Sequence, residues 1–255
     1  MKLVTVTSNT ISDKLKNNED IMLLYPLKSY SVGYPITFDI KDIDGFVLIN
    51  RILDDFEIDE LEKQLHEKNN IKGIVFDDLG ILDIVSDLNI TKILLINHYA
   101  NNTRSINYYL EYVDSVVVSS DITEEEIKEI VKNTIKTVVV NVFGMKDLMY
   151  SRRLLLTNYA KHYNISNKDM IDAKINDNGF KIFENEYGTY FYASKYYNAL
   201  DLLDLDNVLY FWYNPVFLDD EEILDVVINN DVNNIDNDSL FLDKATTYRI
   251  GEAHD

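Results

Sequence analysis

The sequence predicts an α/β protein built as an irregular (β/α)8 barrel of the TIM-barrel type. Short β-rich apolar runs recur along the chain, and the segments between them have helical periodicity or loop composition. The first seven of eight such runs follow one another at intervals of roughly 20 to 25 residues, the spacing of repeated strand–helix units. Strands that are apolar on both faces and alternate with amphipathic helices are typical of a parallel sheet covered by helices. An open, doubly wound sheet is the alternative.

The eight expected strands follow from these runs in chain order. They are Leu3–Thr7, Ile21–Leu24, Phe46–Ile49, Ile74–Phe76, Ile93–Ile96, Val116–Val118, Val138–Val142 and Val208–Trp212. Two connectors show clear helix signals. Ile58, Leu61 and Leu65 form one apolar stripe at helical spacing, and Thr123 with Glu126 forms a capping box that opens another helix.

The segment 143–207 separates the last two strands and is expected to be an insertion. The strand before it should end at Phe143 and Gly144, where a polar loop begins. Within the insertion, Lys181–Phe183 and Thr189–Tyr192 flank the sequence ENEYG and predict an aromatic β-hairpin. We interpret the aromatic rings of this hairpin as a small separate hydrophobic core, because aromatic clusters mostly serve packing. The alternative is that the rings form a surface that binds a ligand. No Gly/Ser or Pro-rich linker interrupts the chain, so we expect a single domain over 1–255.

Composition excludes several classes of function. The 255 residues carry a formal net charge of −20, which argues against direct nucleic-acid binding by the chain alone. The absence of cysteine excludes disulfides, thiolate metal sites and cysteine-bound iron–sulfur clusters, and we expect no cofactor. No signal-peptide pattern and no apolar run of membrane-spanning length occurs, so a cytoplasmic location without membrane association is predicted.

Arginines gather where strands end in an otherwise acidic chain. Four of the five arginines follow predicted strands, and in a barrel these strand ends meet at one rim. The planar guanidinium suits carboxylate or phosphate, which predicts a small anionic ligand. The predicted ligand-binding residues are Arg51, Asn97, Arg104, Tyr150, Arg152 and Arg153. Ion pairing with nearby acids such as Asp54 and Asp55 would give the same pattern, and both interpretations stay open.

The catalytic residues are not identified by any motif, and three weak candidates remain. Asp77 and Asp78 end one strand, where one carboxylate is expected to cap the next helix and the other to be available as acid or base. His98 is the only histidine at a strand end, and Ser151 lies between Tyr150 and Arg152 without a neighbouring base in sequence. Asp77, His98 and Ser151 are therefore the candidates. No paired-histidine spacing occurs, so no metal site is predicted.

Four colinear stretches resemble peptidase family U32, the collagenase-like peptidases. They are IKGIVFDDLGIL, YVDSVVVSSDITEEEIKEI, NVFGMKDLMYSRRLLLTNY, and KIFENEYGTYFYASKYYNALDLL together with FLDKATTYRI. The third resembles the family signature, in which a glycine precedes a tyrosine–serine pair, here Gly144, Tyr150 and Ser151. The resemblance begins near Gly45 and implies a barrel-like fold.

The resemblance also marks what this chain lacks. Many family members carry a cysteine three residues after the signature glycine and another seven residues further on, where they hold an iron–sulfur cluster. Here these positions are Asp147 and Leu154. Because neither supplies a thiolate, we expect a short, cysteine-less member without cluster chemistry.

Three functional hypotheses follow from this resemblance and from the residues. The first is a binding or partner subunit related to RNA or cofactor hydroxylation systems, paired with a longer cysteine-bearing paralogue. The second is a peptidase of unassigned mechanism, in line with the family label. The third is an enzyme or binder for a small carboxylate or phosphate ligand held by the arginines. Whether the protein is an enzyme stays open at this point.

Overall fold

A computed structural model describes residues 1–67, 70–96, 101–175 and 178–244. Eight parallel strands form a closed barrel in which β11 pairs with both β1 and β7, so the ring has no open edge. They are β1 (Lys2–Thr5), β2 (Ile21–Pro26), β3 (Asp44–Ile49), β4 (Asn70–Phe76), β5 (Thr91–Leu95), β6 (Ser115–Val118), β7 (Val138–Ser151) and β11 (Val208–Asn214). All eight predicted strands are confirmed. The predicted barrel is confirmed as well, and the alternative of an open sheet is not observed.

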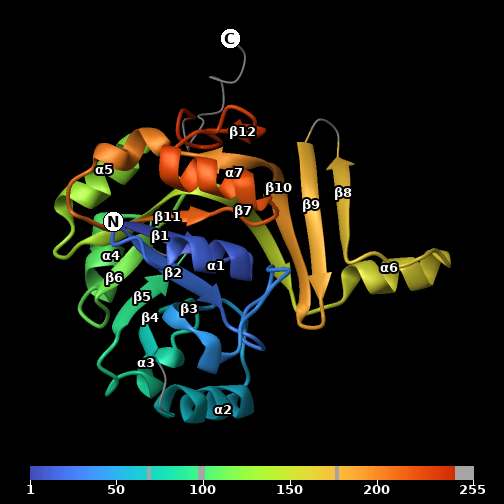
Figure 1. Ribbon diagram of the computed structural model, residues 1–255, viewed down its shortest axis with the longest axis horizontal. Coiled ribbons are helices and arrows are strands. Elements are labelled where there is room, and N and C mark those ends of the chain that lie inside the picture. The colour runs from blue at the N-terminus through green and yellow to red at the C-terminus, as the bar shows by residue number, and fades with distance from the viewer. Residues whose placement is uncertain (68–69, 97–100, 176–177, 245–255) are drawn as a thin grey trace.

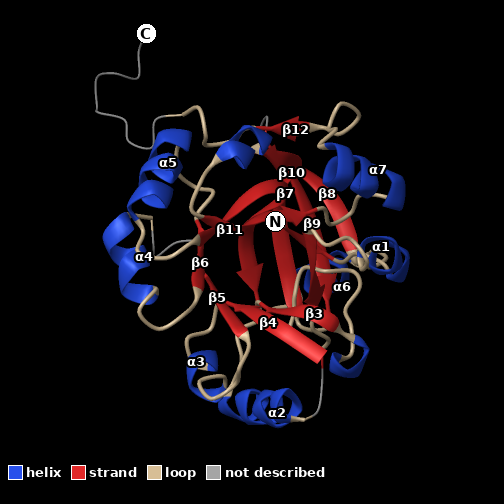
Figure 2. Cartoon of the chain, turned by 60° about the vertical axis from the view of Figure 1, so that its left-hand side comes forward, coloured by secondary structure: helices blue, strands red, loops and turns tan. Residues whose placement is uncertain are grey.

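Helices connect the strands, and all of them except α6 lie around the barrel (Figure 2). They are α1 (Asn9–Leu15), α2 (Asp55–His66), α3 (Ile81–Ile84), α4 (Thr103–Tyr109), α5 (Glu124–Asn133), α6 (Leu155–Tyr163) and α7 (Asp220–Leu224), with short turns η1 (Ile40–Asp42), η2 (Leu200–Asp204) and η3 (Asp225–Asn229). The capping box that opens α5 is present, with Thr123 and Glu126 each bonded to the other's backbone N–H. On α2, Leu61 and Leu65 are buried against the barrel and Ile58 packs on the core's edge. No helix among the described residues is long and apolar enough to cross a membrane.

The barrel strands are apolar on both faces because one side fills the interior and the other meets the helices. In β3, Phe46, Val47, Leu48 and Ile49 are all buried, with at most 1% of each side chain exposed. Burial of one such side chain contributes about 1.5–3 kcal/mol. The same property that made these runs recognisable in the sequence therefore also provides the stability of the barrel.

The largest departure from the predicted elements is strand β7. It does not end at Phe143 and Gly144 but runs for 14 residues from Val138 to Ser151, so the first part of the expected polar loop is strand. Its outer half leaves the barrel and pairs antiparallel with β10 (Gly188–Asn198). Gly144 lies at the junction with a φ of +148°, and a Cβ there would come within 2.3 Å of the carbonyl oxygen of Asn214. The close approach of β11 thus requires glycine at this position.

The insertion forms an arm that extends the barrel sheet. β10 pairs with β9 (Asn178–Asn185), and β9 pairs with β8 (Met170–Ile175), all antiparallel. The predicted hairpin is confirmed, with Asn185 opposite Gly188 across its tight turn. Figure 1 shows β8, β9 and α6 projecting to one side of the barrel. A short strand, β12 (Asn237–Asp238), pairs with β10 near the end of the described chain.

A buried carboxylate holds α6 onto this arm. Leu154, the residue before the helix, makes no side-chain cap. Instead Glu184 of β9, only 6% exposed, accepts hydrogen bonds from the backbone N–H of Leu156 at 2.7 Å and of Thr157 at 2.9 Å. The hydroxyls of Thr157 and Thr189 lie 2.5 and 2.6 Å from its oxygens. Burial alone would raise the pKa of Glu184, but these hydrogen bonds together outweigh burial and lower it.

Candidate functional site

A cavity of about 720 Å³ opens at the carboxyl ends of the barrel strands. Asn50 follows β3, Asp77 follows β4, and Leu95 ends β5. Asp147 of β7, Tyr150 of β7 and Tyr190 of β10 close the opposite side, so the inserted arm supplies part of the wall. This volume is within the range of small-molecule sites, and this end of a (β/α)8 barrel is where such sites are built.

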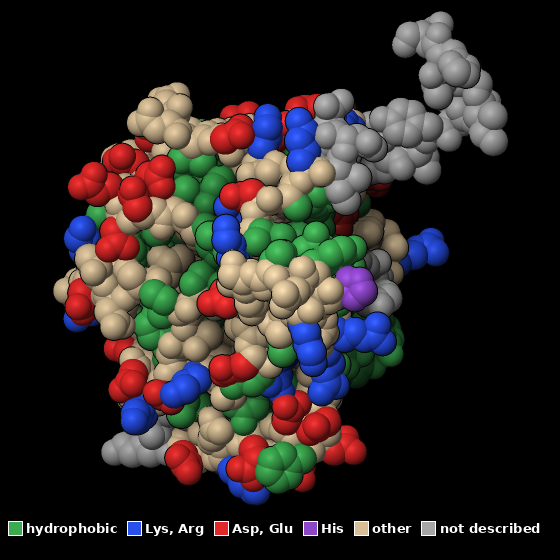
Figure 3. Space-filling view, turned by 90° about the vertical axis from the view of Figure 1, so that its right-hand side faces the viewer, with side chains coloured by type: hydrophobic (Ala, Val, Ile, Leu, Met, Phe, Trp, Pro, Cys, Tyr) green, Lys and Arg blue, Asp and Glu red, His purple; other side chains and the backbone are tan. Residues whose placement is uncertain are grey.

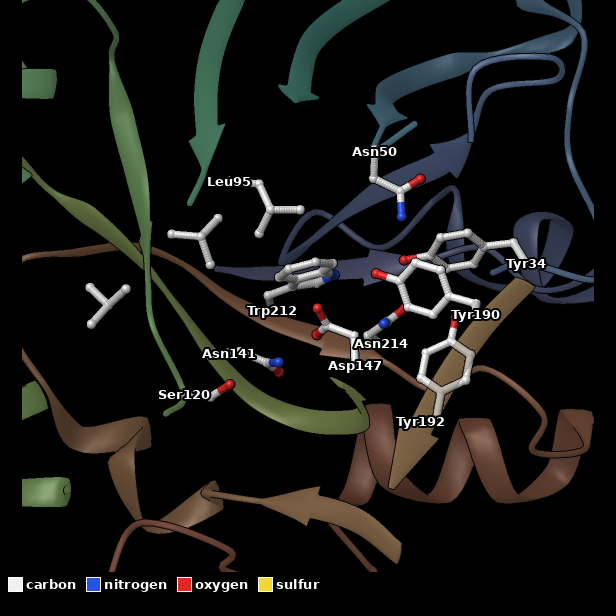
Figure 4. A pocket seen from close by; sticks show the side chains of 12 residues that line it. Tyr34, Asn50, Leu95, Ser120, Asn141, Asp147, Tyr190, Tyr192, Trp212 and Asn214 are labelled. Carbon is white, nitrogen blue, oxygen red and sulfur yellow. The ribbon is translucent and has the colours of Figure 1, made fainter. Parts of the chain in front are cut away.

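A smaller chamber of about 20 Å³ adjoins this cavity. The two share four lining residues: Asn50, Leu95, Asp147 and Tyr190. Figure 4 shows side chains from β6, β7, β10 and β11 directed toward the chamber, including Asn141, Asp147 and Asn214. Such a volume holds one group the size of a water molecule.

Two amide oxygens of the chamber lack partners. The Oδ1 atoms of Asn141 and Asn214 are buried and accept no hydrogen bond within the described part of the chain. Buried side-chain polar atoms are bonded in the large majority of cases, because an unpaired one costs about 1–3 kcal/mol. The chamber therefore keeps two acceptors available for a donor.

The two adjacent aspartates of the cavity have different environments. Asp78 accepts the backbone N–H of Gly80 at 2.9 Å, which confirms that one carboxylate of the pair caps the following turn. Asp77 faces the cavity, where desolvation, then the charge of Asp78, and then that of Asp147 raise its pKa to about 7. The side chain is nevertheless accessible to water through the cavity mouth, and this hydration limits the shift. A carboxyl with this pKa exchanges protons near neutral pH.

Buried contacts fix the cavity wall formed by the loop after β2. Asn50 accepts from the backbone N–H of Val32 at 3.0 Å and donates to its carbonyl at 3.1 Å. Tyr192 donates to the carbonyl of Gly33 at 2.6 Å, and a Cβ at Gly33 would lie 2.3 Å from that hydroxyl. Tyr34, the next residue, lines the chamber, and burial raises its pKa far above the ordinary tyrosine value. The loop is thus positioned by the barrel and by the arm together.

The positive charge nearest to the chamber is already paired. Lys146, 2% exposed, donates to the hydroxyl of Ser120 at 2.8 Å and forms an ion pair with Asp121 at the same distance. Ser120 lines the chamber. No Lys or Arg lines the cavity or the chamber among the residues that the structure describes. Asp77, Asp78 and Asp147 therefore dominate the charge of the site.

Arg51 lies beside the site rather than in its wall. Its guanidinium is buried, forms an ion pair with Glu57 of α2, and stacks on the ring of Tyr187 with its central carbon 4.6 Å from the ring centroid. Burial lowers the pKa of Arg51 because it disfavours the charged form. The Nε–H group has no hydrogen-bond partner among the residues that the structure describes. In this position Arg51 connects the barrel, α2 and the turn of the hairpin.

The other predicted site residues are dispersed. Arg104 on α4, Arg152 and Arg153 are exposed, and none of them lines the cavity. Ser151 accepts the backbone N–H of Arg153 at 3.2 Å and is likewise absent from the cavity wall. Asn97 and His98 lie outside the described residues. Of the predicted set, the structure brings together Asp77 and Tyr150, whose hydroxyl donates to the carbonyl of Tyr187 at 3.0 Å. The proposed roles of the remaining residues stay predictions.

Several residues of the site were not anticipated from the sequence. Asp147 received attention only as the place of a missing cysteine, while the structure puts it in the walls of both the cavity and the chamber. Asn141 and Asn214 were missed as well. A signal for them existed, because each is an amide within or directly after an apolar strand, in VVVNVF and VLYFWYN. A metal centre is not supported by the described residues, since they contain no group of three or more His, Asp or Glu side chains that could hold an ion.

The sequence comparison identifies the family. Residues 39–203 match the sequence profile of Peptidase family U32, which covers well over half of the chain, and the chain belongs to this family. The matched region runs from the loop before β3 through the arm to η2, and therefore includes Asp77, Asn141, Asp147 and Tyr190 but not Asn214. No curated protein and no solved structure matches the chain.

Proposed function

We propose that the cavity at the barrel mouth is a hydrolytic site for peptide or related amide bonds, with Asp77 and Asp147 as its acid–base pair. The observation that carries this proposal is the raised pKa of Asp77 beside a second carboxylate in a cavity large enough for a substrate. A carboxyl group with a raised pKa can act as an acid and a neighbouring carboxylate as a base, as in other carboxylate-based enzymes. Membership of a peptidase family agrees with this reaction class.

The proposed reaction uses water and no further reagent. The carboxylate of Asp147 accepts a proton from water as the water oxygen forms a bond to the carbonyl carbon. The protonated Asp77 donates its proton to the amide nitrogen as the carbon–nitrogen bond breaks. The products are a carboxylic acid and an amine, and proton exchange with solvent through the open cavity restores both aspartates.

The raised pKa of Asp77 determines the pH dependence of this reaction. Because Asp77 must be protonated to act as the acid, the rate should fall as the pH rises through about 7. The measurement is kcat/KM for a hydrolysed peptide between about pH 5 and pH 9. A rate that keeps increasing across this range would contradict the assignment of Asp77 as the acid.

Incubation of the purified protein with a set of synthetic peptides, followed by mass spectrometry, tests the activity. Asp77→Asn and Asp147→Asn should each lower the rate by about 100-fold or more, which is the usual contribution of a general acid or base. Asp13→Asn is the matched control, because Asp13 lies exposed on α1, where it forms an ion pair with the exposed Lys16. Turnover that survives both cavity substitutions would overturn the proposal.

A second candidate function is that of a partner subunit beside a longer, cysteine-bearing paralogue in an RNA or cofactor hydroxylation system. The observation in its favour is the exposed apolar surface of the projecting arm. Tyr159, Tyr163, Ile165 and Met170 each expose more than 40% of their surface. On this side of the molecule, hydrophobic side chains are interspersed with basic and acidic ones (Figure 3). A protein partner fits such a mixed surface better than free RNA does.

Affinity purification of the chain from its native host, followed by mass spectrometry, tests this second function. The paralogue should co-purify with the wild-type chain and be lost from a Tyr159→Asp/Tyr163→Asp variant. The unrelated substitution Asp13→Asn should leave the association intact. Recovery of the chain without any cysteine-bearing relative would exclude this candidate.

A further inference from the structure

The small chamber beside the cavity has a composition that selects one kind of chemical group. Asn214 is 7% exposed, yet its Oδ1 has no hydrogen-bond partner, and the Oδ1 of Asn141 is in the same situation. The carboxylate of Asp147 lies in the same wall. The chamber thus combines two unpartnered amide oxygens with a nearby negative charge, around a space for one small group.

The orientation of the Asn214 amide follows from its neighbour. The side chain of Asn214 interacts with the Tyr34 hydroxyl, and because the Oδ1 atom of Asn214 has no partner among the described residues, this interaction involves its amide N–H group. The carbonyl oxygen of the amide is then left without a donor. A ligand group must therefore donate hydrogen bonds rather than accept them.

The charge of the surroundings favours a cation over an anion. Asp77 and Asp78 lie in the adjoining cavity, and no described Lys or Arg lines either space. Lys146 is neutralised by Asp121 on the far side of Ser120. An anion placed here would meet unpaired acceptors and like charge, whereas a cation would be stabilised by both. The ring of Trp212, which also lines the chamber, adds a surface that attracts cations.

The size of the chamber limits which kind of cation can bind. The chamber volume of about 20 Å³ suits a single group of about the size of water, which a primary ammonium is and a guanidinium or a trimethylated amine is not. A primary ammonium also carries enough N–H donors to serve both amide oxygens. The adjoining cavity of about 720 Å³ leaves room for the rest of the molecule.

We propose that the amide oxygens of Asn141 and Asn214 bind the primary ammonium group of the ligand in this chamber, and that the larger cavity accommodates the rest of the ligand. This inference rests on the proposed function for its biological meaning: the substrate would be a peptide with a free amino terminus. The ammonium group would then be held at the inner end, and the bond to be cleaved would lie toward Asp77.

Binding is tested independently of catalysis with methylammonium chloride as the probe. Methylammonium should raise the Tm of the wild-type protein at constant ionic strength, since a ligand specific to the native state stabilises it. Sodium acetate, of similar size and opposite charge, should not. Asn214→Leu should weaken methylammonium binding by about tenfold or more, as expected for loss of a charge-assisted hydrogen bond. Asn141→Leu provides a second variant, and Asn234→Leu in an exposed loop is the matched control.

Each alternative outcome counts against the proposal. Equal stabilisation by potassium chloride would indicate a site for a simple monovalent cation. Stabilisation by acetate would indicate that the amides present their N–H groups and that the site takes anions. Methylammonium binding that is unchanged in both asparagine variants would place the ammonium elsewhere.

Peptide hydrolysis separates this inference from the proposed function. A peptide with a free amino terminus should be cleaved at least about tenfold faster than the same peptide with an acetylated terminus. Equal cleavage of the two would refute the ammonium site and leave the hydrolytic function standing. Methylammonium binding that depends on Asn214, without cleavage of any peptide, would support the ammonium site and refute the hydrolytic function.

Discussion

Two buried polar clusters of this protein differ in how their acceptors are used. Under α6, Glu184 receives two backbone N–H groups and lies within hydrogen-bond distance of two hydroxyls. In the chamber at the barrel mouth, the amide oxygens of Asn141 and Asn214 accept no hydrogen bond from any residue that the structure describes. A cluster whose acceptors are all bonded stabilises the fold, whereas open buried acceptors cost stability unless a ligand binds them. The difference indicates that the first cluster stabilises the fold, and it supports our proposal that the second binds a ligand.

The largest expected effect is on the structural cluster. Glu184→Ala leaves the first N–H groups of α6 and two hydroxyls without their acceptor, so the free energy of unfolding should fall by about 3 kcal/mol in urea denaturation. Glu184→Gln keeps part of these bonds and should cost about half as much. If Glu184→Ala lowers the free energy of unfolding by less than about 0.5 kcal/mol, the Glu184 cluster does not stabilise the fold and does not differ from the chamber in this respect.

The pH dependence of the same cluster sharpens the comparison. The pKa of Glu184 is lowered by folding, so its carboxylate contributes stability above the unfolded-state pKa, and this contribution is lost as pH falls through the folded-state pKa. The stability difference between wild type and Glu184→Gln should therefore shrink below about pH 4. Urea denaturation at several pH values measures it, and a difference that is constant with pH would contradict the assignment.

Arg51 is expected to behave as a structural residue as well. Arg51→Met removes the ion pair with Glu57 and the stacking on Tyr187 while keeping an apolar stem. We expect a loss of about 2 kcal/mol, less than for a fully buried pair because Glu57 is partly exposed. Arg104→Met, at an exposed position of α4, is the control and should change stability by less than about 0.5 kcal/mol. Equal effects would mean that Arg51 does not anchor the hairpin.

The smallest expected effect is on Asp77 in the cavity, where substitution should raise stability and not lower it. Its pKa is raised by folding to about 7, so the native state binds more protons than the unfolded state at intermediate pH. Stability contributed by the protonated form is present at low pH and is lost as pH rises through about 7. Asp77→Asn should raise Tm near pH 8, because it removes the destabilising charge, and should leave Tm unchanged near pH 4, where Asp77 is protonated. The expected rise near pH 8 is only about 2 °C, because solvent in the cavity screens the charge. A lower Tm for Asp77→Asn near pH 8 would contradict this account.

The barrel was predictable from the sequence because its signal is local and repeated. Each run such as Phe46–Ile49 is apolar on both faces, and this property marks a buried parallel strand without knowledge of its neighbours. The extension of β7 to Ser151 was not predictable in the same way. Residues 146–151 are mixed in polarity, and their strand conformation depends on pairing with β10, whose paired residues lie from 38 (Ser151 with Thr189) to 45 (Asp147 with Tyr192) positions further along the chain.

The candidate site was only partly predictable for a related reason. Strand ends could be located, so Asp77 and Tyr150 were anticipated at the rim. Whether a charged side chain faces the cavity depends on local geometry that composition does not contain. Arg51 is directed to Glu57 instead, while Asp147 faces inward although it stands where the family's cysteine would be.

The unfolding free energy of the double variant Asn141→Leu/Asn214→Leu, measured with and without methylammonium chloride, tests the central contrast most directly. Replacement of two unbonded buried amides by apolar groups of similar size should leave stability unchanged or raise it by about 1 kcal/mol. The variant should also no longer respond to methylammonium. A loss of about 3 kcal/mol, as expected for Glu184→Ala, together with an unchanged methylammonium response, would show that these amides support the fold and not a ligand.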